Sequence, residues 1–154
     1  MPFRYKGLAR ESFSEFFAMS DAELAARGVR SMIADAKPGF PCRISLEDAE
    51  RGERVLLLSF PHQTVHSPYK ASGPIFVREA ASASYDGTSD PPALRNRLLS
   101  LRAYDGDGMM VDAEIVEGNA VETLLERLFA RADVANVHIH NARRGCFACS
   151  VERD

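Results

Sequence analysis

The chain has 154 residues, of which 45% are hydrophobic and 27% are charged, and its formal net charge is −3. This composition is ordinary for one soluble globular domain, and it excludes a disordered, collagen-like or coiled-coil protein. No apolar run approaches the ~18 residues of a membrane-spanning helix, and the basic surplus of nucleic-acid-binding domains is missing, so we expect neither a membrane nor a nucleic acid as a partner.

The N-terminal part of the chain predicts two short helices followed by a loop. Ser20 and Glu23 have the spacing of a capping box, in which each side chain bonds to the backbone N–H of the other residue. We therefore expect helices at about residues 13–18 and 21–27. Residues 36–42 carry two prolines around a glycine, which is typical of a turn-rich loop.

The middle of the chain predicts strands joined by loops. Residues 55–60 form a continuous apolar run, short enough for a buried strand, and residues 75–79 predict a second strand. We expect residues 61–73 to form a long loop and residues 80–92, which are small and polar, to form a mobile one. Pro92 suits the first turn of a short helix.

Two Asp-Gly pairs at residues 105–108 lie between strand-like runs at 98–104 and 109–116, which is a strong signal for a β-hairpin. The Asp-x-Asp-Gly pattern also resembles the start of a calcium loop. That interpretation fails, because Met109 and Met110 occupy the positions where a calcium loop has an oxygen ligand and a glycine.

The C-terminal part predicts one helix and a final hairpin. Asn119 is placed to cap the helix, and Glu122 follows three residues later, before apolar residues that share one helical face. The hairpin comprises residues 134–142 and 146–151. The order of the elements predicts a single α+β domain over residues 1–154, with a mainly antiparallel sheet and helices packed on one face.

The register of the final hairpin decides which side chains meet. A three-residue turn with Gly145 in the left-handed position is favoured, because a two-residue turn would place arginines at positive φ. The opposed residues are then Ala142 and Cys146, His140 and Ala148, and His138 and Ser150. Because side chains alternate along a strand, we expect His138, His140 and Cys146 on one face and Cys149 in the core. The two cysteines then cannot form a CxxC motif, whose sulfurs must converge.

We name His138, His140 and Cys146 on this face as catalytic candidates. Their side chains allow several functions. The imidazoles and a thiolate could bind a metal ion, a histidine could act as base for the thiol, or the histidines with Arg143 and Arg144 could hold an anion. The plain alternative is a set of polar side chains on the solvent side of a half-covered sheet. The small residues beside the histidines favour a covered pocket.

Further ligand-binding candidates lie outside the strands of this hairpin. They are Arg43 and Arg78 as anion clamps, Arg144 in the final turn, and His62 and Tyr69 in the loop at 61–73. Binding residues often lie on loops at strand ends, and we expect the loops at 37–43 and 61–73 to close the site.

The cysteines and the N-terminal residues indicate the cellular compartment of the protein. Three cysteines are an odd, small number, which argues against a secreted disulfide framework. The first residues contain no apolar segment of the kind that a signal peptide needs. We therefore expect a cytoplasmic protein.

Four stretches of the chain are familiar together: Asp35 to Arg43, Pro68 to Glu79, Tyr104 to Val111, and His138 to Cys146. In that order they resemble a bacterial family known as domain of unknown function 1203. The resemblance spans nearly the whole chain and implies a small stand-alone bacterial protein. It carries no established activity, so it implies no catalytic residue and no cofactor.

The leading hypothesis from the sequence is a small-molecule site, binding or catalytic, with an anion as a candidate ligand. The alternative is a non-enzymatic structural or interaction protein that forms a homodimer through a sheet edge or face. The sequence leaves the substrate, the reaction, the cofactor, a bound metal and the oligomeric state open.

Overall fold

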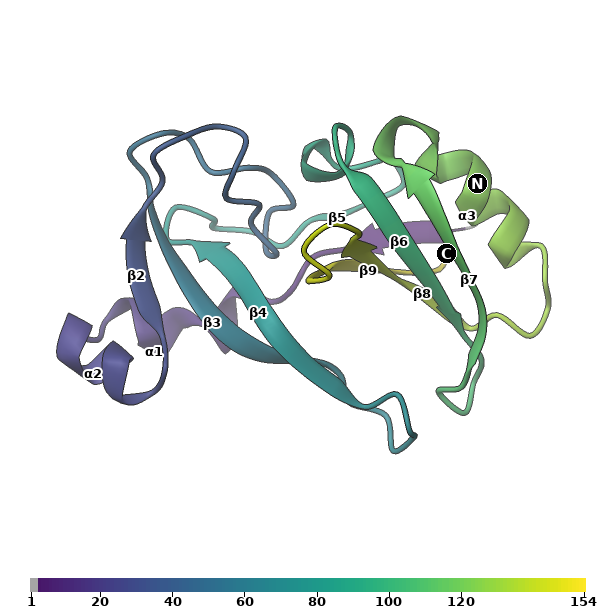
Figure 1. The fold of residues 1–154 in the computed structure, drawn as a ribbon, viewed down its shortest axis with the longest axis horizontal. Helices are drawn as coiled ribbons and strands as arrows, with labels where there is room; N and C mark the ends of the chain where they lie inside the picture. Colours follow the sequence, from purple (N-terminus) through teal and green to yellow (C-terminus); the bar gives the residue numbers. More distant parts are fainter. Residues whose placement is uncertain (1–2) are drawn as a thin grey trace.

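The computed structural model describes residues 3–154, which form two antiparallel sheets (Figure 1). The larger sheet has the strand order β5-β1-β9-β8-β6-β7, and the smaller one has the order β2-β3-β4. The larger sheet comprises β1 (Phe3–Lys6), β5 (Asp86–Gly87), β6 (Leu98–Tyr104), β7 (Met110–Glu117), β8 (Asn136–Asn141) and β9 (Phe147–Arg153). The smaller sheet comprises β2 (Arg30–Ile33), β3 (Arg54–Gln63) and β4 (Ala71–Arg78).

Within residues 3–154, three α-helices accompany the sheets, and the residues at which they begin test the capping predictions. They are α1 (Ser14–Phe17), α2 (Asp21–Ala26) and α3 (Val121–Phe129), and short 3-10 turns occur at Arg10–Ser12, Pro92–Leu94 and Gly118–Ala120. The predicted capping box of Ser20 and Glu23 is present at α2. The prediction that Asn119 caps α3 is wrong, because a 3-10 turn takes up Asn119 and places Ala120 at the cap position. Among residues 3–154, no helix has the length and apolar character needed to cross a bilayer.

Each sheet has its own hydrophobic core, and the helices are divided between the two. One face of α3, with Leu125 and Leu128, packs on Leu101 and Ile139 of the larger sheet. The segment that carries α1 and α2 packs instead on the smaller sheet, as Figure 1 shows at the left of the molecule. The fold is therefore mainly antiparallel with few helices, and the helices do not gather on one face of one sheet.

Several strand boundaries differ from the predictions. The β6–β7 hairpin is confirmed, with Asp105 Oδ1 accepting hydrogen bonds from the backbone N–H of Asp107 and Met109. The strand expected at 55–60 continues to Gln63 across an irregularity in its pairing with β4, so His62 lies on a strand and not on a loop. Part of the segment expected to be a mobile loop forms β5, which pairs with β1.

The last hairpin differs from its predicted register at the turn. Gly145 does adopt the left-handed conformation, with φ of 79°. The turn is one residue longer than expected, however, because Asn141 N–H bonds to the Cys146 carbonyl. A bulge in β9 then restores the predicted pairing of His138 with Ser150, while His140 lies opposite Phe147 instead of Ala148.

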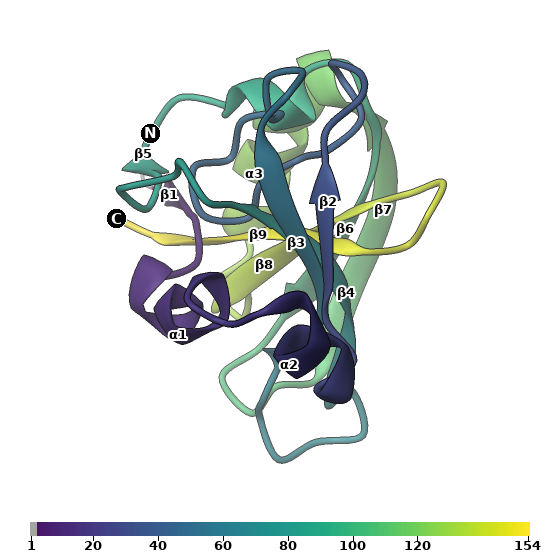
Figure 2. The same cartoon turned by 90° about the vertical axis from the view of Figure 1, so that its left-hand side faces the viewer.

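This register gives β8 two distinct faces. Val137 and Ile139 face the core beneath α3, and His138 and His140 therefore point to the opposite side, toward the smaller sheet. Figure 2 looks at the molecule from the side of the smaller sheet, whose strands cross in front of β8 and β9. Residues from both sheets can thus meet on the histidine face.

Candidate functional site

A pocket of about 540 Å³ lies where the loop before β3, the final turn and the start of β6 come together. Its polar lining includes Arg43, Asn96, Arg97, Asn141, Arg143, Arg144 and Cys146. Apolar side chains such as Met32, Phe40 and Phe76 line the rest. The volume falls in the range of small-molecule sites. Residues 39–41 and 43 line this pocket, whereas no residue of 61–73 and none of the histidines of the predicted site does.

Arg43 is buried in this pocket without an acidic partner among the described residues. It is only 2% exposed, and its guanidinium donates to the carbonyls of Phe147 (Nε, 2.7 Å) and Pro41 and to the sulfur of Cys146 (Nη2, 3.1 Å). Burial lowers the pKa of Arg43, and Cys146 acts in the opposite direction. A buried guanidinium without a carboxylate is costly unless an anion compensates it.

The other arginines of the pocket divide into one paired residue and two without an ion pair. Arg97 makes a bidentate bond to Asp48, at 2.7 and 2.8 Å. Arg143 and Arg144 are exposed and make no ion pair within residues 3–154. Among residues 3–154, Glu117 is the one acidic residue that lines the pocket. The pocket therefore carries excess positive charge.

Asn141 and Cys146 complete the polar wall of the pocket. Asn141 Nδ2 donates to Cys146 Sγ at 3.5 Å, while Asn141 Oδ1 is buried and has no hydrogen-bond partner among the described residues. Buried polar atoms are normally satisfied, so packing alone does not explain an unpaired Oδ1 at this position. Cys146 thus faces Arg43 and Asn141 and not the histidines, which corrects the expectation that His138, His140 and Cys146 share a face.

Cys146 is expected to be the one thiol that reacts rapidly with DTNB in the native protein. Cys42 and Cys149 are each 1% exposed, so the reagent does not reach either sulfur, and burial also raises the pKa of the Cys149 thiol to about 12. Cys146 is partly exposed and lies beside a guanidinium. Native-state titration should give about one fast thiol per chain, and C146S should abolish it. Rapid labelling that persists in C146S would contradict this assignment.

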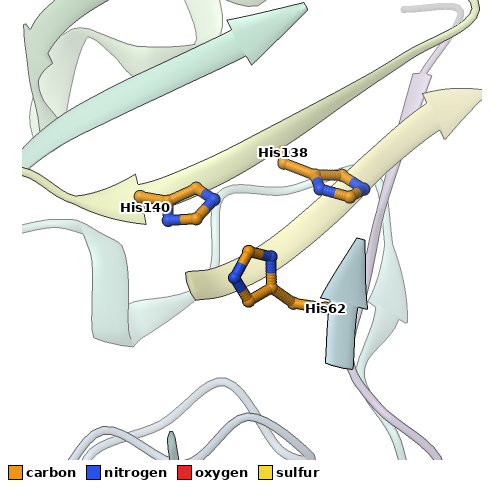
Figure 3. Close-up of side chains that lie close together, drawn as sticks. All are labelled: His62, His138 and His140. Carbon is orange, nitrogen blue, oxygen red and sulfur yellow. The ribbon is translucent and has the colours of Figure 1, made fainter. Parts of the chain in front are cut away.

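A second polar cluster lies on the other face of β8. His138 and His140 come from this strand, and His62 reaches them from β3 of the smaller sheet (Figure 3). One ring nitrogen from each histidine lies within 4.8 Å of the other two. His138 and His140 are 8% and 1% exposed, so the interpretation as solvent-facing polar residues is wrong.

Phe147 and Tyr104 hold the three imidazoles in place. The ring of His62 stacks on Phe147 with a centroid separation of 5.4 Å, and both other histidines meet Phe147 edge to face. Tyr104 packs against His138 at 5.1 Å. Aromatic packing of this kind fixes ring planes but leaves the ring nitrogens without polar partners.

Hydrogen bonding fixes the tautomer of one histidine. His140 Nδ1 lies 2.9 Å from the Gly145 carbonyl, which can only accept, so Nδ1 carries the proton and Nε2 carries a lone pair. His140 Nε2, His62 Nδ1 and His138 Nδ1 are buried without hydrogen-bond partners among the described residues. Burial, with a contribution from Arg102, lowers the pKa of all three histidines, to about 4 for His138 and His140.

Two sequence candidates lie outside both clusters. The Arg78 guanidinium donates to Glu53 (2.9 Å), Glu47 (3.0 Å) and Ser45 (3.1 Å), so two carboxylates compensate its charge, and it does not line the pocket. Arg78 therefore does not act as an anion clamp in the pocket. Tyr69 is 36% exposed and packs on Tyr104 with a centroid separation of 6.1 Å, next to the histidine cluster and away from the pocket.

Comparison with known proteins places the chain in a family. The model of the family described as "Protein of unknown function (DUF1203)" matches residues 39–153, which is more than half of the chain. The chain belongs to the DUF1203 family. No curated protein and no solved structure matches it. The part that matches the DUF1203 model contains Arg43, Cys146 and all three clustered histidines, so both clusters lie within the family region.

Some residues of the two clusters had no signal in the sequence. In the sequence, Asn141 stands at the end of a predicted strand and Arg97 is one of many arginines. No pattern therefore singled out either residue as part of a site. Both became visible only through their contacts, Asn141 through its unsatisfied oxygen and Arg97 through Asp48. Arg43 and Arg144 were identified as anion-binding candidates and do line the pocket.

Proposed function

We propose that this protein binds a small anionic molecule, a carboxylate or a phosphate, in the pocket lined by Arg43, Arg143 and Arg144. The observation that carries the proposal is the buried guanidinium of Arg43, which has no carboxylate partner among the described residues and borders a cavity of small-molecule size. Arginine is suited to this role because its planar fork matches carboxylate and phosphate oxygens.

The parts of the pocket have complementary roles. Arg43 is fixed by two backbone carbonyls, so its position is preorganised for an anion. Arg143 and Arg144 are exposed at the final turn, where they attract the anion and close over it. Phe40 and Phe76, whose rings meet at 5.1 Å, offer an apolar wall for the remainder of the ligand.

The proposal is tested with citrate, inorganic phosphate and sulfate, and with neutral glucose as the negative control. At least one anion is expected to raise the Tm of the protein and to give a saturable isotherm in calorimetry, because ligands that bind only the folded state stabilise it. The double variant R143A/R144A should bind that anion at least about tenfold more weakly, given the energy of hydrogen bonds to charged groups. The same anion should slow the labelling of Cys146 by DTNB.

A matched control separates local contacts from overall charge. R51A/R127A removes the same charge from two exposed arginines that do not line the pocket, and it should bind the anion like the wild type. The proposal fails if no anion binds, or if both double variants lose the same affinity.

The alternative of a homodimer joined at a sheet edge has less support. The edge strand β7 carries Asp112, Glu114 and Glu117, and acidic side chains on an edge oppose pairing with a second copy. Two further edges, β2 and β5, have four and two residues, and short edges pair poorly. The remaining edge, β4, has eight residues, but it contains Pro74, and Cys42 already forms a bridge with its Phe76. Light scattering would detect such a dimer directly.

A further inference from the structure

We propose that His62, His138 and His140 bind one divalent transition-metal ion, for which Zn²⁺ is the best-fitting species. The three imidazoles come from two different sheets and offer one nitrogen each to a common point, as Figure 3 shows. This site is separate from the anion pocket, because none of the three histidines lines that pocket. The inference therefore does not depend on the proposed function.

Packing alone does not explain the three buried nitrogens. In the structure, His62 Nδ1, His138 Nδ1 and His140 Nε2 have no hydrogen-bond partner among the described residues. An unsatisfied buried polar atom destabilises a fold, and three of them on clustered rings are unusual for a core built only for packing. A metal ion would satisfy all three lone pairs at once.

His140 is already oriented as a ligand. Its Nδ1–H donates to the Gly145 carbonyl at 2.9 Å, so Nε2 is held as a lone pair directed away from the turn. Metal-bound histidines typically make this type of bond through their second nitrogen, which fixes the tautomer and the ring orientation. Figure 3 shows the rings of His138 and His62 on the side toward which His140 projects.

The distances require only a small adjustment. Zn–N bonds of 2.0–2.1 Å in tetrahedral geometry place two ligand nitrogens about 3.3 Å apart. The nitrogens of the cluster lie within 4.8 Å of one another, so each pair closes by at most about 1.5 Å, within the reach of side-chain rotation. The stacking of His62 on Phe147 limits this motion and keeps the ring near the other two.

The donor set indicates both the metal and its fourth ligand. Three neutral imidazoles without carboxylate or thiolate suit Zn²⁺ and related transition metals and leave one coordination position for an exogenous ligand. Arg102 lies on the neighbouring strand β6, directly opposite His138 in the strand register. The Arg102 side chain therefore lies on the same face of the sheet as His138. Its positive charge favours an anionic ligand, such as hydroxide, at that position.

The test uses untagged protein treated with EDTA and dialysed, to which Zn²⁺ or Co²⁺ is added alone. Wild-type protein is expected to bind one equivalent, with a rise in Tm on adding Zn²⁺ and with the visible absorption of tetrahedral Co²⁺. H62A should weaken Zn²⁺ binding more than about 100-fold, because the loss of even an outer partner of a ligand costs 10- to 100-fold. H62Q, which keeps a polar side chain of similar length, should show the same loss.

His66 provides the matched control, because it is the fourth histidine of the chain and lies exposed in the loop after β3. H66A should keep wild-type Zn²⁺ affinity and the Co²⁺ spectrum, and so should R143A/R144A, whose changes lie in the other site. Circular dichroism confirms that H62A and H62Q are folded before titration. The inference is overturned if wild-type protein binds no stoichiometric Zn²⁺, if H62A and H62Q retain its affinity, or if H66A loses it equally.

Discussion

G118A is expected to destabilise the protein by about 3 kcal/mol or more, the upper part of the range for overpacked sites. A Cβ atom on Gly118 would lie 1.7 Å from the carbonyl oxygen of Leu94 and 2.7 Å from its carbonyl carbon. Both atoms belong to the backbone, so no flexible side chain can move aside. The junction also contains a hydrogen bond of 2.8 Å from Gly118 N–H to the Arg97 carbonyl.

This close approach matters for the pocket as well as for stability. Glu117, directly before Gly118, and Asn96 and Arg97, which follow the 3-10 turn at Pro92–Leu94, all line the pocket. A shift of the junction that relieved the overlap would move these residues together. We therefore expect G118A to weaken anion binding in addition to lowering stability.

G106A is the appropriate control for G118A. A Cβ on Gly106, in the turn between β6 and β7, would have no atom within 4 Å. Its effect should stay within about 0.5 kcal/mol, as for ordinary surface changes. Guanidinium unfolding at neutral pH measures the stability of both variants. In thermal unfolding, the Tm of G118A is expected to be lower than that of the wild type by ~6 °C or more. Equal midpoints for G118A and wild type would contradict the contact.

The parts of the fold that were predictable from the sequence are those with local signals. The capping box of Ser20 and Glu23 lies within one helical turn, and the Asp-Gly pairs lie between the two strands that they join. β1 was missed although Phe3 and Tyr5 alternate with polar residues, because four residues give a weak pattern. Its partner β9 lies at the other end of the chain, and no local rule encodes that pairing.

In the candidate sites too, local patterns predicted some contacts, whereas contacts that depend on long-range packing were missed. Strand alternation was enough to place His138 and His140 on one face, and the structure has them there. His62 joins them only because the two sheets pack together, which is a long-range event. The prediction placed Cys146 on the wrong face because the turn has one extra residue and β9 has a compensating bulge. No sequence pattern indicates either feature. The result is two clusters where the sequence indicated one.

The metal-free protein is expected to lose about 4 kcal/mol of stability between about pH 7 and about pH 5 because of His138 and His140. Burial lowers the pKa of each histidine in the folded state to about 4, from 6.5. Neighbouring His62 on β3 and Arg102 on β6 also lower the pKa of both rings, whereas the hydrogen bond to the Gly145 carbonyl acts in the opposite direction on His140. In the unfolded chain both histidines titrate near the ordinary value.

The sign follows from proton uptake. Well above pH 6.5 both states hold neutral histidines, and the folded state has its full stability. As the pH falls below that value, the unfolded chain takes up protons that the folded state excludes, so unfolding becomes easier until the pH reaches the folded pKa of about 4. Each histidine contributes about 2 kcal/mol by about pH 5, which together gives the expected loss of about 4 kcal/mol.

Denaturant unfolding in the presence of EDTA at these two pH values measures the effect. H138Q/H140Q removes both groups and should flatten the dependence, whereas H66Q, which changes an exposed histidine, should keep the wild-type slope. Carboxylates with lowered pKa, such as Glu53, act at lower pH and so do not obscure this window. Equal stability of the wild type at both pH values, or a flattened slope in H66Q, would show that the two buried imidazoles do not resist protonation.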